Sequence, residues 1–519
     1  MRTPSPSVPG SGTQASVLGA SAPYHAPLFI DGTWCDASSG ATLAVINPTT
    51  GQPLGTLAAA GAEDVDRAVA AANSAFERGL WRDAPVQERA RVLNRFADLF
   101  EAELEAFFRL ETLNNGRPIV ETRAQIGRLG QFYRYFAALA LTRRSDVIPV
   151  EGPYLNYTQR VPLGVAALVS SFNHPLMILS KSLAPALATG NSVVIKPSEQ
   201  TPYTSVRLVE LLTAAGVPAG VINIVNGAGA DVAAPLVAHR GIRKVVFTGG
   251  SDIGRKIGAA AAQNFAAVTL ELGGKGAAIV FEDMEIERAV NGTAFAAFIA
   301  AGQTCICGSR ILVQRSRYHE FLAAFGPKIA AIHVGDPSNP RTQLGPVISE
   351  RSRRRILALL ERAKRDGAQV LTGGGIPSGV PDGGFFLEPT VLYDVDPHSE
   401  IAQDEIFGPV TVVIPFEDEA EALRIANGTR FGLGASLWTN DVARAHRVAN
   451  KLLFGMVWIN DHHRLDPASP WGGFKESGVG RETGSESFDH FTEPRVVTVN
   501  TTGRTVDWYA ADGTAKRLN

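Results

Sequence analysis

Residues 244–254 read KVVFTGGSDIG, and residues 255–257 continue them as RKI. The apolar residues 245–247, which follow Lys244, favour a buried strand. The two glycines favour a tight turn, and the residues that follow favour a helix. Glycines let a backbone approach a pyrophosphate closely, and a helix N-terminus offers N–H donors and the positive end of a dipole. The spacing departs from GxGxxG, so a plain connecting loop is the alternative interpretation. We interpret the stretch as a phosphate-binding turn.

Strands and helices alternate through the residues before this turn. Short apolar runs predict the strands, and amphipathic stretches between them predict the helices. Such connections are right-handed and build a parallel sheet with helices on both faces. The sequence therefore predicts an α/β fold with a doubly wound, Rossmann-like sheet. The predicted strands are Val165–Val169, Ser192–Ile195, Val221–Val225 and Lys244–Phe247, and the predicted helices are Ser182–Ala188, Ser205–Ala215 and Asp231–Ala238.

Further elements are predicted on both sides of this sheet. Apolar positions at helical spacing predict a helix at Asp64–Gly79 and one long helical run at Val86–Thr112. Residues 147–162 alternate like a hairpin, and residues 495–500 are predicted as a final strand. A strand at Leu28–Ile30 opens the fold. A second α/β stretch has predicted helices at Ile286–Ala301, Arg354–Arg365 and Asp418–Asn427 and predicted strands at Ile311–Gln314 and Val410–Ile414.

The composition is that of a globular protein and excludes several function classes. A chain of 519 residues is too long for one core and predicts two or three domains. With 19% charged residues and a net charge of −2, nothing indicates a nucleic-acid partner or a membrane surface, and no apolar run reaches the length of a bilayer span. Residues 1–27 are expected to be a disordered extension without a targeting signal, and residues 501–519 a polar tail.

Three cysteines occur, Cys35, Cys305 and Cys307. So sparse and odd a count argues against a disulfide framework and for a reducing compartment, the cytoplasm. No His or Cys pair at ligand spacing supports the last two cysteines, so no metal site is expected.

Two short motifs carry the chemistry. Glu271 opens ELGGK, and Cys305 closes GQTC at residues 302–305. A thiol makes a thioester, and a carboxylate activates the water that hydrolyses it. The alternative for Cys305 is a small apolar core residue, as most free cysteines are. Cys307 lacks the motif position and is expected to be such a core residue.

ELGGK followed by GQTC resembles the NAD(P)-dependent aldehyde dehydrogenase superfamily, and the resemblance runs from about residue 28 to residue 500. It implies a Rossmann-like cofactor domain, an α/β catalytic domain and a small β oligomerisation arm. The domains implied are residues 28–146 with 163–272 for NAD binding, 273–485 for catalysis, and 147–162 with 486–500 for the arm. In the family the arm segments pair with each other and extend a sheet across a subunit boundary.

The resemblance also implies a cofactor site. Lys196 and Glu199 match family residues that hold the adenosine ribose, and a carboxylate at that place repels a 2′-phosphate, so NAD is expected rather than NADP. Glu405 matches the residue that binds the nicotinamide ribose, and Phe407 the ring that packs near the nicotinamide. The other cofactor-binding residues expected are Phe172, Ser198, Gly249, Gly250, Ser251, Gly254 and Leu272.

For the reaction, the resemblance implies that the Cys305 thiolate attacks an aldehyde and that Asn173, with the Cys305 N–H, holds the oxyanion. Glu271 then activates the water that releases the acid. Glu482 matches a second family glutamate that relays protons, with an exposed helix charge as the alternative. Without the family, Asn173 is a turn residue.

Several residues near the substrate depart from the family pattern. His174 replaces an aromatic residue, and Phe172 a Trp. The family has a helix Lys at the position of Ser182, whereas Lys181 lies one step early, which turns its ammonium by about 100° and argues against a relay role. In the family the loop at 461–467, here DHHRLDP, borders substrate entry. Arg464 is expected to attract an anionic group on the substrate, with neutralisation by Asp461 or Asp466 as the alternative, and the two adjacent histidines are interpreted as solvated. The mouth residues expected are His174, Ile306, His462 and Arg464.

A small-molecule aldehyde is therefore the expected substrate, and a homodimer or homotetramer the expected assembly. The enzymatic rival is a CoA-acylating semialdehyde dehydrogenase, which typically lacks the water-activating Glu271. A catalytically silent homologue is the rival from another class, and the set Asn173, Glu271 and Cys305 argues against it.

Overall fold

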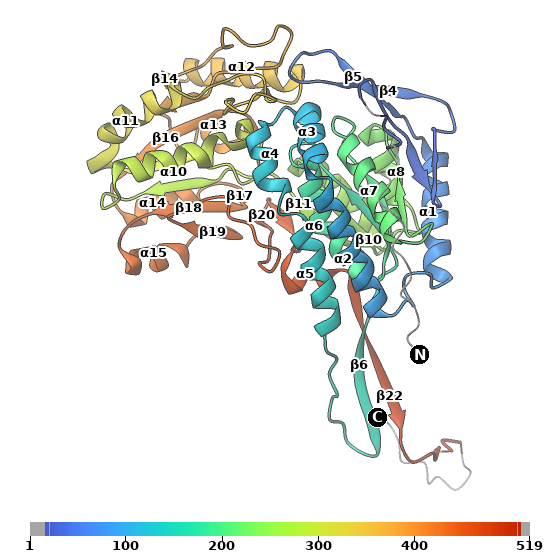
Figure 1. The fold of residues 1–519 in the computed structure, drawn as a ribbon. Coiled ribbons are helices and arrows are strands. Elements are labelled where there is room, and N and C mark those ends of the chain that lie inside the picture. The colour runs from blue at the N-terminus through green and yellow to red at the C-terminus, as the bar shows by residue number, and fades with distance from the viewer. Residues whose placement is uncertain (1–15, 20, 506, 510–519) are drawn as a thin grey trace, which may run out of the picture.

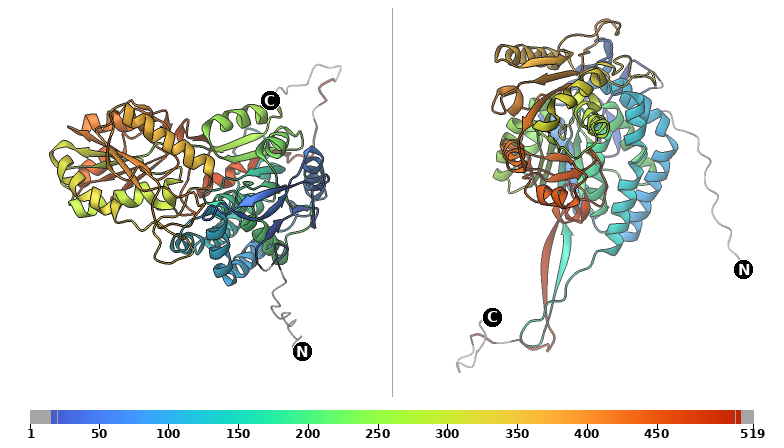
Figure 2. Two further views of the ribbon diagram at one scale, coloured as in Figure 1. Left: turned by 90° about the horizontal axis from the view of Figure 1, so that it is seen from above. Right: turned by 90° about the vertical axis from the view of Figure 1, so that its left-hand side faces the viewer.

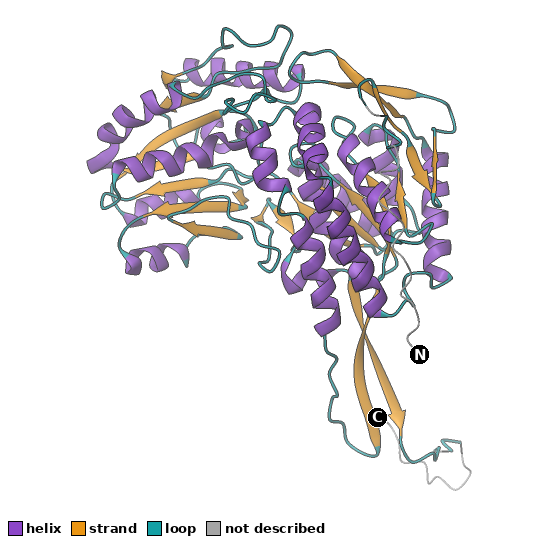
Figure 3. Ribbon diagram, in the orientation of Figure 1, coloured by secondary structure: helices purple, strands orange, loops and turns teal. Residues whose placement is uncertain are grey.

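Two units built on parallel sheets lie side by side, and a long two-stranded arm projects below the first of them (Figures 1 and 2). This computed structural model describes residues 16–19, 21–505 and 507–509. Helices cover both faces of each sheet, as Figure 3 shows. The predicted α/β class, with a Rossmann-like sheet and a second α/β unit, is confirmed.

The first sheet has eight strands in the order β21-β11-β10-β7-β8-β9-β2-β3, and its five central strands are parallel. The strand order reverses direction at β7, so ligands are expected beyond the carboxyl ends of the strands beside it. The bounds are β2 Leu28–Ile30, β3 Thr33–Cys35, β7 Val165–Val169, β8 Ser192–Lys196, β9 Ile222–Ile224, β10 Lys244–Thr248, β11 Ala267–Glu271 and β21 Gly478–Val479.

Side chains alternate across this sheet and enter two cores. Leu168 and Ile195 face the core formed with α2, α5, α6 and α7, whereas Val169 and Val194 face the core formed with α1, α8 and α9. Because both faces are covered, the central strands are largely apolar, with a few buried polar residues such as Asn223 and Thr269. The helices are α1 Ala62–Glu77, α2 Val86–Ala102, α5 Gly130–Thr142, α6 Pro175–Ala188, α7 Tyr203–Ala215, α8 Ala234–Ala238 and α9 Ser251–Gln263.

The second sheet has seven strands in the order β14-β15-β16-β13-β12-β18-β19, all parallel except β14. Its strands are β12 Ala277–Val280, β13 Arg310–Gln314, β14 Gln369–Thr372, β15 Thr390–Tyr393, β16 Val410–Phe416, β18 Gly434–Trp438 and β19 Met456–Ile459. Around it lie α10 Ile286–Phe298, α11 Tyr318–Ala330, α12 Glu350–Arg365, α13 Glu400–Gln403, α14 Glu419–Asn427 and α15 Val442–Ala449.

The arm consists of β6 Tyr154–Pro162 and β22 Thr492–Asn500, antiparallel along their whole length (Figure 1). The pairing of two segments far apart in sequence was predicted. A hairpin within residues 147–162 was also predicted, and it is present only in part: an antiparallel bridge joins Val147 to Tyr157, flanked by two backbone hydrogen bonds, and no strand precedes β6 there. The helix α16 Gly484–His490 leads from the second unit into β22.

Four other sequence predictions need correction. The helical run 86–112 is two helices, α2 and α3 Leu104–Asn115, because Glu103 leaves the helical region at φ −113° and ψ 14°. The helix predicted to Ala301 ends at Phe298. The extension predicted as disordered to residue 27 contains strand β1 Tyr24–Ala26, which pairs with β5 Pro53–Ala58, and β5 also pairs with β4 Thr42–Ile46. Residues 1–15 and 510–519 lie outside the described residues.

The fourth correction concerns the unit to which residues 478–479 belong. Strand β21, expected in the catalytic domain, is the edge of the first sheet and pairs with β11. The other predicted domain boundaries stay predictions.

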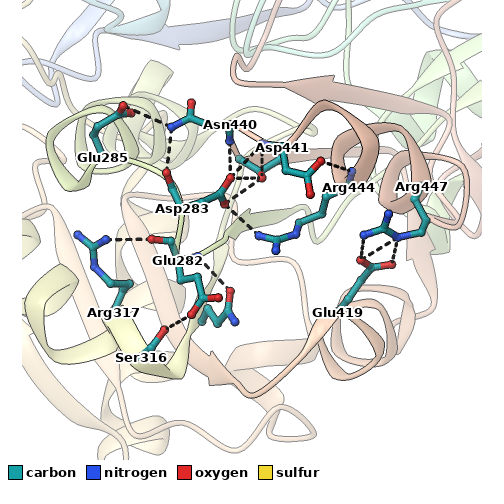
Figure 4. Close-up of polar contacts among 12 residues, drawn as sticks. Glu282, Asp283, Glu285, Ser316, Arg317, Glu419, Asn440, Asp441, Arg444 and Arg447 are labelled. Atoms are coloured by element: carbon teal, nitrogen blue, oxygen red, sulfur yellow. Dashed lines mark hydrogen bonds and ion pairs between the residues drawn. The ribbon is translucent and has the colours of Figure 1, made fainter.

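A polar cluster around Asp283 ties three loops of the second unit together (Figure 4). The Asp283 carboxylate accepts hydrogen bonds from the Thr439 hydroxyl, from the N–H groups of Asn440 and Asp441, and from the Arg444 guanidinium, at 2.8–3.0 Å. Burial raises the pKa of Asp283, but these hydrogen bonds outweigh it and the pKa lies below its ordinary value. Asp283 therefore holds the start of α15 against the end of β12.

We expect Asp283→Ala to lower the thermal unfolding midpoint by about 4 °C, because two backbone N–H groups, a hydroxyl and a guanidinium lose their acceptor. Differential scanning fluorimetry measures it. Glu285→Gln is the matched control, since Glu285 is exposed and accepts a hydrogen bond from the side chain of the same residue, Asn440, at 3.3 Å. Equal shifts in the two variants would contradict a special role for Asp283.

Candidate active site

A cavity of about 370 Å³ is lined by residues from both sheet units. The first unit contributes α4 Ile119–Ile126, α6 and the end of β11, and the second contributes the segments 295–305 and 461–467. The structure thus brings three sequence-predicted residues, Asn173, Glu271 and Cys305, to one cavity. His174, His462 and Arg464 line it as well.

Cys305 follows a strained turn. Ala300, Ala301 and Gly302 have φ values of 55°, 53° and 67°, a left-handed conformation that costs free energy for the two alanines. The Glu121 carboxylate accepts the Ala300 N–H at 3.1 and 3.2 Å and holds this turn. A Cβ on Gly302 would lie 2.0 Å from the Gly408 carbonyl oxygen, so only glycine fits there. The thiol is presented by backbone that other residues keep in place.

The Cys305 thiol is protonated in this environment. Burial raises its pKa to about 12, the Lys181 ammonium opposes that rise, and the Glu271 and Glu405 carboxylates add to it. A thiolate at this position therefore needs positive charge nearby.

Asn173 lies at the carboxyl side of β7 and is buried against the cysteine turn. Its Nδ2 donates to the Gln303 carbonyl at 2.9 Å, and its Oδ1 accepts from the Ser171 hydroxyl. The Gln303 contact fixes which end of the amide is the nitrogen, because a carbonyl oxygen can only accept a hydrogen bond. The second amide hydrogen is then left to donate to an oxyanion beside Cys305.

Glu271 ends β11, where ligands of parallel sheets bind. Its pKa is raised well above the ordinary value, first by burial and then by the Glu482 carboxylate, while Lys181, Arg481 and a contact with Trp471 lower it. Neither Glu271 oxygen accepts a hydrogen bond of regular geometry within the described structure. Such a carboxylate is poised to take a proton from water.

The loop after Glu271 is rigid. The buried Arg310 guanidinium donates twice to the Lys275 carbonyl, at 2.9 and 3.1 Å, and once each to the carbonyls of Ile425 and Ala426. Burial lowers the pKa of Arg310 to about 10 and that of Lys275 to about 7. The lysine of ELGGK is thus a structural residue, and its ammonium donates to the Ile401 carbonyl.

Lys181 reaches the site, so the inference that its one-residue shift along the helix turns its ammonium away from the site is wrong. Its Nζ lies 2.5 Å from Glu482 Oε2 and 4.6 Å from the centre of the Trp471 ring, and it lines the cavity. Ser182, at the family's Lys position, donates to Glu482 Oε1 at 2.6 Å. Glu482 itself is buried, which excludes the alternative of an exposed helix charge.

The glycine turn has the shape expected of a phosphate site. A Cβ built on Gly250, the residue that caps α9, meets nothing within 4 Å, so open space lies in front of the helix N-terminus. The Gly249 N–H donates to the Glu271 carbonyl at 3.0 Å, which couples this turn to the catalytic strand. The Ser251 hydroxyl turns away and donates to the Glu476 carbonyl. Gly254 packs on Leu272, because a Cβ there would clash with its side chain at 2.4 Å.

The other predicted cofactor residues gather at two places. At the end of β8, the Lys196 Nζ lies 2.8 Å from Glu199 Oε2. Ser198, which precedes Glu199 in the sequence, is buried. Glu405 accepts the Gly274 N–H at 3.0 Å, and burial raises its pKa to about 7. The rings of Phe172 and Phe407 meet edge to face with centres 5.6 Å apart.

The predicted mouth residues are only partly at the mouth. Ile306 is fully buried against Leu433 and Trp471, so its prediction as a mouth residue is wrong. His462 borders the cavity but is not solvated, because its ring nitrogens contact the Ser436 hydroxyl and the Ile306 carbonyl. Burial lowers the pKa of His462 to about 4 and that of His463 to about 3.

Sequence reasoning missed a network behind the mouth. Buried Arg117 contacts Glu111 and Glu121 at 3.4 Å and Gln125 at 2.8 Å, and Gln125 contacts the His174 ring at 3.0 Å. In the sequence, Arg117 belongs to the Gly-Arg-Pro at residues 116–118, which follows the predicted helical run 86–112. A charged residue within a helix-ending motif was the available signal.

Within the described residues, no group of three or more metal-ligating side chains is present, and no helix is both long and apolar enough to cross a bilayer.

Comparison with known proteins identifies the family. Residues 34–497 match the sequence profile of the aldehyde dehydrogenase family. Phenylacetaldehyde dehydrogenase of Pseudomonas fluorescens is 39% identical over 480 residues, which cover 91% of this chain and 95% of that protein. The NAD+ complex of betaine aldehyde dehydrogenase from Staphylococcus aureus superposes with a TM-score of 0.91 at 38% identity, covering 93% and 96% of the two chains. PnpE of Pseudomonas sp. WBC-3, solved with nicotinamide adenine dinucleotide, superposes with a TM-score of 0.90 at 43% identity, covering 93% and 99%. With this profile, these relatives and this fold, the chain belongs to the aldehyde dehydrogenase family and is an enzyme of that family.

Proposed function

We propose that this protein oxidises an aldehyde to the carboxylic acid with NAD as hydride acceptor. The observation that carries the proposal is the cavity that Cys305, Glu271 and Asn173 share, next to a glycine turn hydrogen-bonded to Glu271. NAD, when bound, supplies the site that accepts the hydride.

The reaction begins at sulfur. As the Cys305 thiol loses its proton to water, its sulfur bonds to the aldehyde carbon, and Lys181 stabilises the developing thiolate. Asn173 Nδ2 and the Cys305 N–H hold the oxyanion. Loss of hydride from that carbon leaves a thioester on Cys305.

Hydrolysis then restores the enzyme. Glu271 takes a proton from water, and the hydroxide attacks the thioester carbon. The C–S bond breaks, the acid leaves, and Cys305 regains its thiol. Glu482, held by Lys181 and Ser182, is placed to pass the proton of Glu271 onward.

The residues present fit NAD. Open space before α9 suits a pyrophosphate, and the Lys196–Glu199 pair at the end of β8 suits ribose hydroxyls. The Glu199 carboxylate repels a 2′-phosphate, which supports NAD over NADP. The NAD complexes of structural neighbours support the same choice.

An aldehyde panel assayed for NADH and NADPH release tests the proposal. We expect acid formation with NAD and a higher KM for NADP. Absence of NADH release with every aldehyde would refute the proposed function, and formation of an acyl-CoA in place of the free acid when CoA is added would favour the acylating rival.

The pH profile provides a further test. Glu271 acts in its ionised form, and its raised pKa means that kcat rises with pH as this group ionises. Glu482→Gln removes a like charge and leaves Lys181 free to attract Glu271, so both effects lower the Glu271 pKa. We expect the acid limb of kcat to move about one pH unit lower. Exposed Glu486→Gln is the control and should leave the limb in place, and a shift to higher pH in Glu482→Gln would contradict the role of Glu482.

We also propose that the arm joins copies of the chain into a homodimer or homotetramer. Leu155 and Val499 face each other across the arm and are 43% and 42% exposed. An isolated two-stranded ribbon with exposed apolar residues and an open edge is a template for sheet extension. The cytoplasm is the compartment that we propose, because it keeps a cysteine nucleophile reduced.

We expect the double variant Leu155→Asp/Val499→Asp to elute as a monomer of about 55.1 kDa in size-exclusion chromatography with light scattering, while the wild type elutes as a multiple of that mass. Charges on the apolar pair oppose its burial. Thr502→Asp, beyond the strand, is the control. Wild-type protein that is already monomeric would refute the proposal.

A further inference from the structure

Two guanidinium groups stand at the rim of the catalytic cavity without a partner. Arg128, between α4 and α5, and Arg464, in the segment 461–467, both line the cavity and are both exposed. Neither side chain makes an ion pair or a hydrogen bond with any described residue. The other two cations of the cavity lining, Arg117 and Lys181, are both paired with carboxylates. These two arginines are therefore free to bind a ligand.

Among the exposed charges that line the cavity, Arg128 and Arg464 outnumber the one carboxylate, Asp461. Arg117 is balanced by the buried Glu111 and Glu121, whose pKa values burial raises, and Lys181 is balanced by Glu482. Two lining carboxylates remain. Glu271 is buried beside Cys305, and Asp461 is exposed and accepts the His462 N–H at 2.7 Å. The three histidines of the cavity, His174, His462 and His463, have pKa values lowered by burial and are neutral.

A cationic substrate does not suit this cavity. Quaternary ammonium groups bind over aromatic faces, best over Trp, and Trp471 is the tryptophan of a lining whose other aromatic rings are Phe132 and Phe295. That ring already has the Lys181 ammonium 4.6 Å from its centre. A second cation would meet Lys181 inside and the two arginines at the rim.

An apolar wall lies in the same cavity. Phe132, Met177, Ile178 and Phe295 contribute to its lining. Such side chains pack against a hydrocarbon segment, so a substrate with an aldehyde at one end, a hydrocarbon middle and an anionic group at the other end matches all three parts.

We propose that the substrate is an aldehyde that carries a carboxylate at its far end, the semialdehyde of a dicarboxylic acid, and that Arg128 and Arg464 bind this carboxylate. The inference rests on the proposed function and adds its substrate class. Guanidinium groups bind carboxylates through paired, charge-assisted hydrogen bonds, which makes the two arginines specificity residues.

Matched aldehydes test this inference. We compare kcat/KM, with NAD, for 6-oxohexanoate against hexanal and for 4-oxobutanoate against butanal. The wild type is expected to prefer at least one carboxylate-bearing aldehyde by about tenfold or more, and this preference should shrink as salt rises.

Charge-removing variants assign the preference to the two arginines. Arg128→Gln/Arg464→Gln is expected to lower kcat/KM for the preferred semialdehyde about 10- to 100-fold, mainly through KM, and for the neutral aldehyde less than about threefold. Arg240→Gln is the matched control, because Arg240 is an exposed arginine outside the cavity, and it should change neither value.

The outcomes separate the two proposals. Turnover of the neutral aldehydes with no preference for either semialdehyde, or equal losses for both kinds of aldehyde in the double variant, would overturn the substrate class alone. Failure of every aldehyde to yield NADH would overturn the proposed function.

Discussion

Cys305→Ala is expected to abolish aldehyde oxidation, with a loss of at least about 10³-fold in kcat. The sulfur of Cys305 forms the bond to the aldehyde carbon. Neither of the other two thiols lines the cavity, because Cys35 lies on β3 and the buried Cys307 thiol donates to the Ala297 carbonyl. NADH formation at saturating aldehyde measures the effect. Binding of NAD should persist, because the glycine turn and the Lys196–Glu199 pair belong to the first unit, whereas Cys305 belongs to the second.

Cys307→Ala is the matched control for this variant. It removes a thiol two residues away and should retain most of the activity, since Cys307 does not line the cavity. Titration of NAD by quenching of tryptophan fluorescence checks that both variants fold and bind. Full activity of Cys305→Ala would refute the assignment of the nucleophile.

Glu271→Gln is expected to release one burst of NADH per active site and then to stall, with steady turnover about 10²- to 10⁴-fold below the wild type. The amide has the shape of the carboxylate but takes no proton from water, so the thioester forms and is not hydrolysed. Stopped-flow absorbance at 340 nm resolves the two phases.

Mass spectrometry of the stalled enzyme should show the acyl group on Cys305. The exposed Glu486→Gln variant is the control and should turn over steadily. Steady turnover of Glu271→Gln at the wild-type rate would remove Glu271 as the base, and absence of the burst would place its role before thioester formation.

The doubly wound sheet was predictable because buried parallel strands are largely apolar runs. Each run at residues 165–169, 192–195 and 244–247 became a strand within one residue of its expected bounds. The break at Glu103 was not predictable, because apolar spacing continues across it from α2 into α3. Strand β1 was missed because three residues in a Ser- and Pro-rich segment are too short to show an alternation of apolar and polar side chains.

In the site, short motifs predicted the reactive residues, whereas the prediction for Lys181 neglected the length of its side chain. The 100° rotation of Lys181 about its helix is real, but a long flexible side chain reaches Glu482 nevertheless. Ile306 and His462 were assigned to the mouth from their sequence neighbours, whereas the chain turns both inward. Arg128 was not singled out, because only the fold brings it to the same rim as Arg464.

By itself, the sequence determined the fold class, the family and the thiol–carboxylate pair, because apolar periodicity and short motifs are local properties of a chain. Tertiary structure alone decided which charges are paired. It joined Arg117 to Glu111, and Lys181 to Glu482, and left Arg128 and Arg464 free at one rim. Burial and distance set the electrostatics of a site, and both depend on residues that are far apart in sequence.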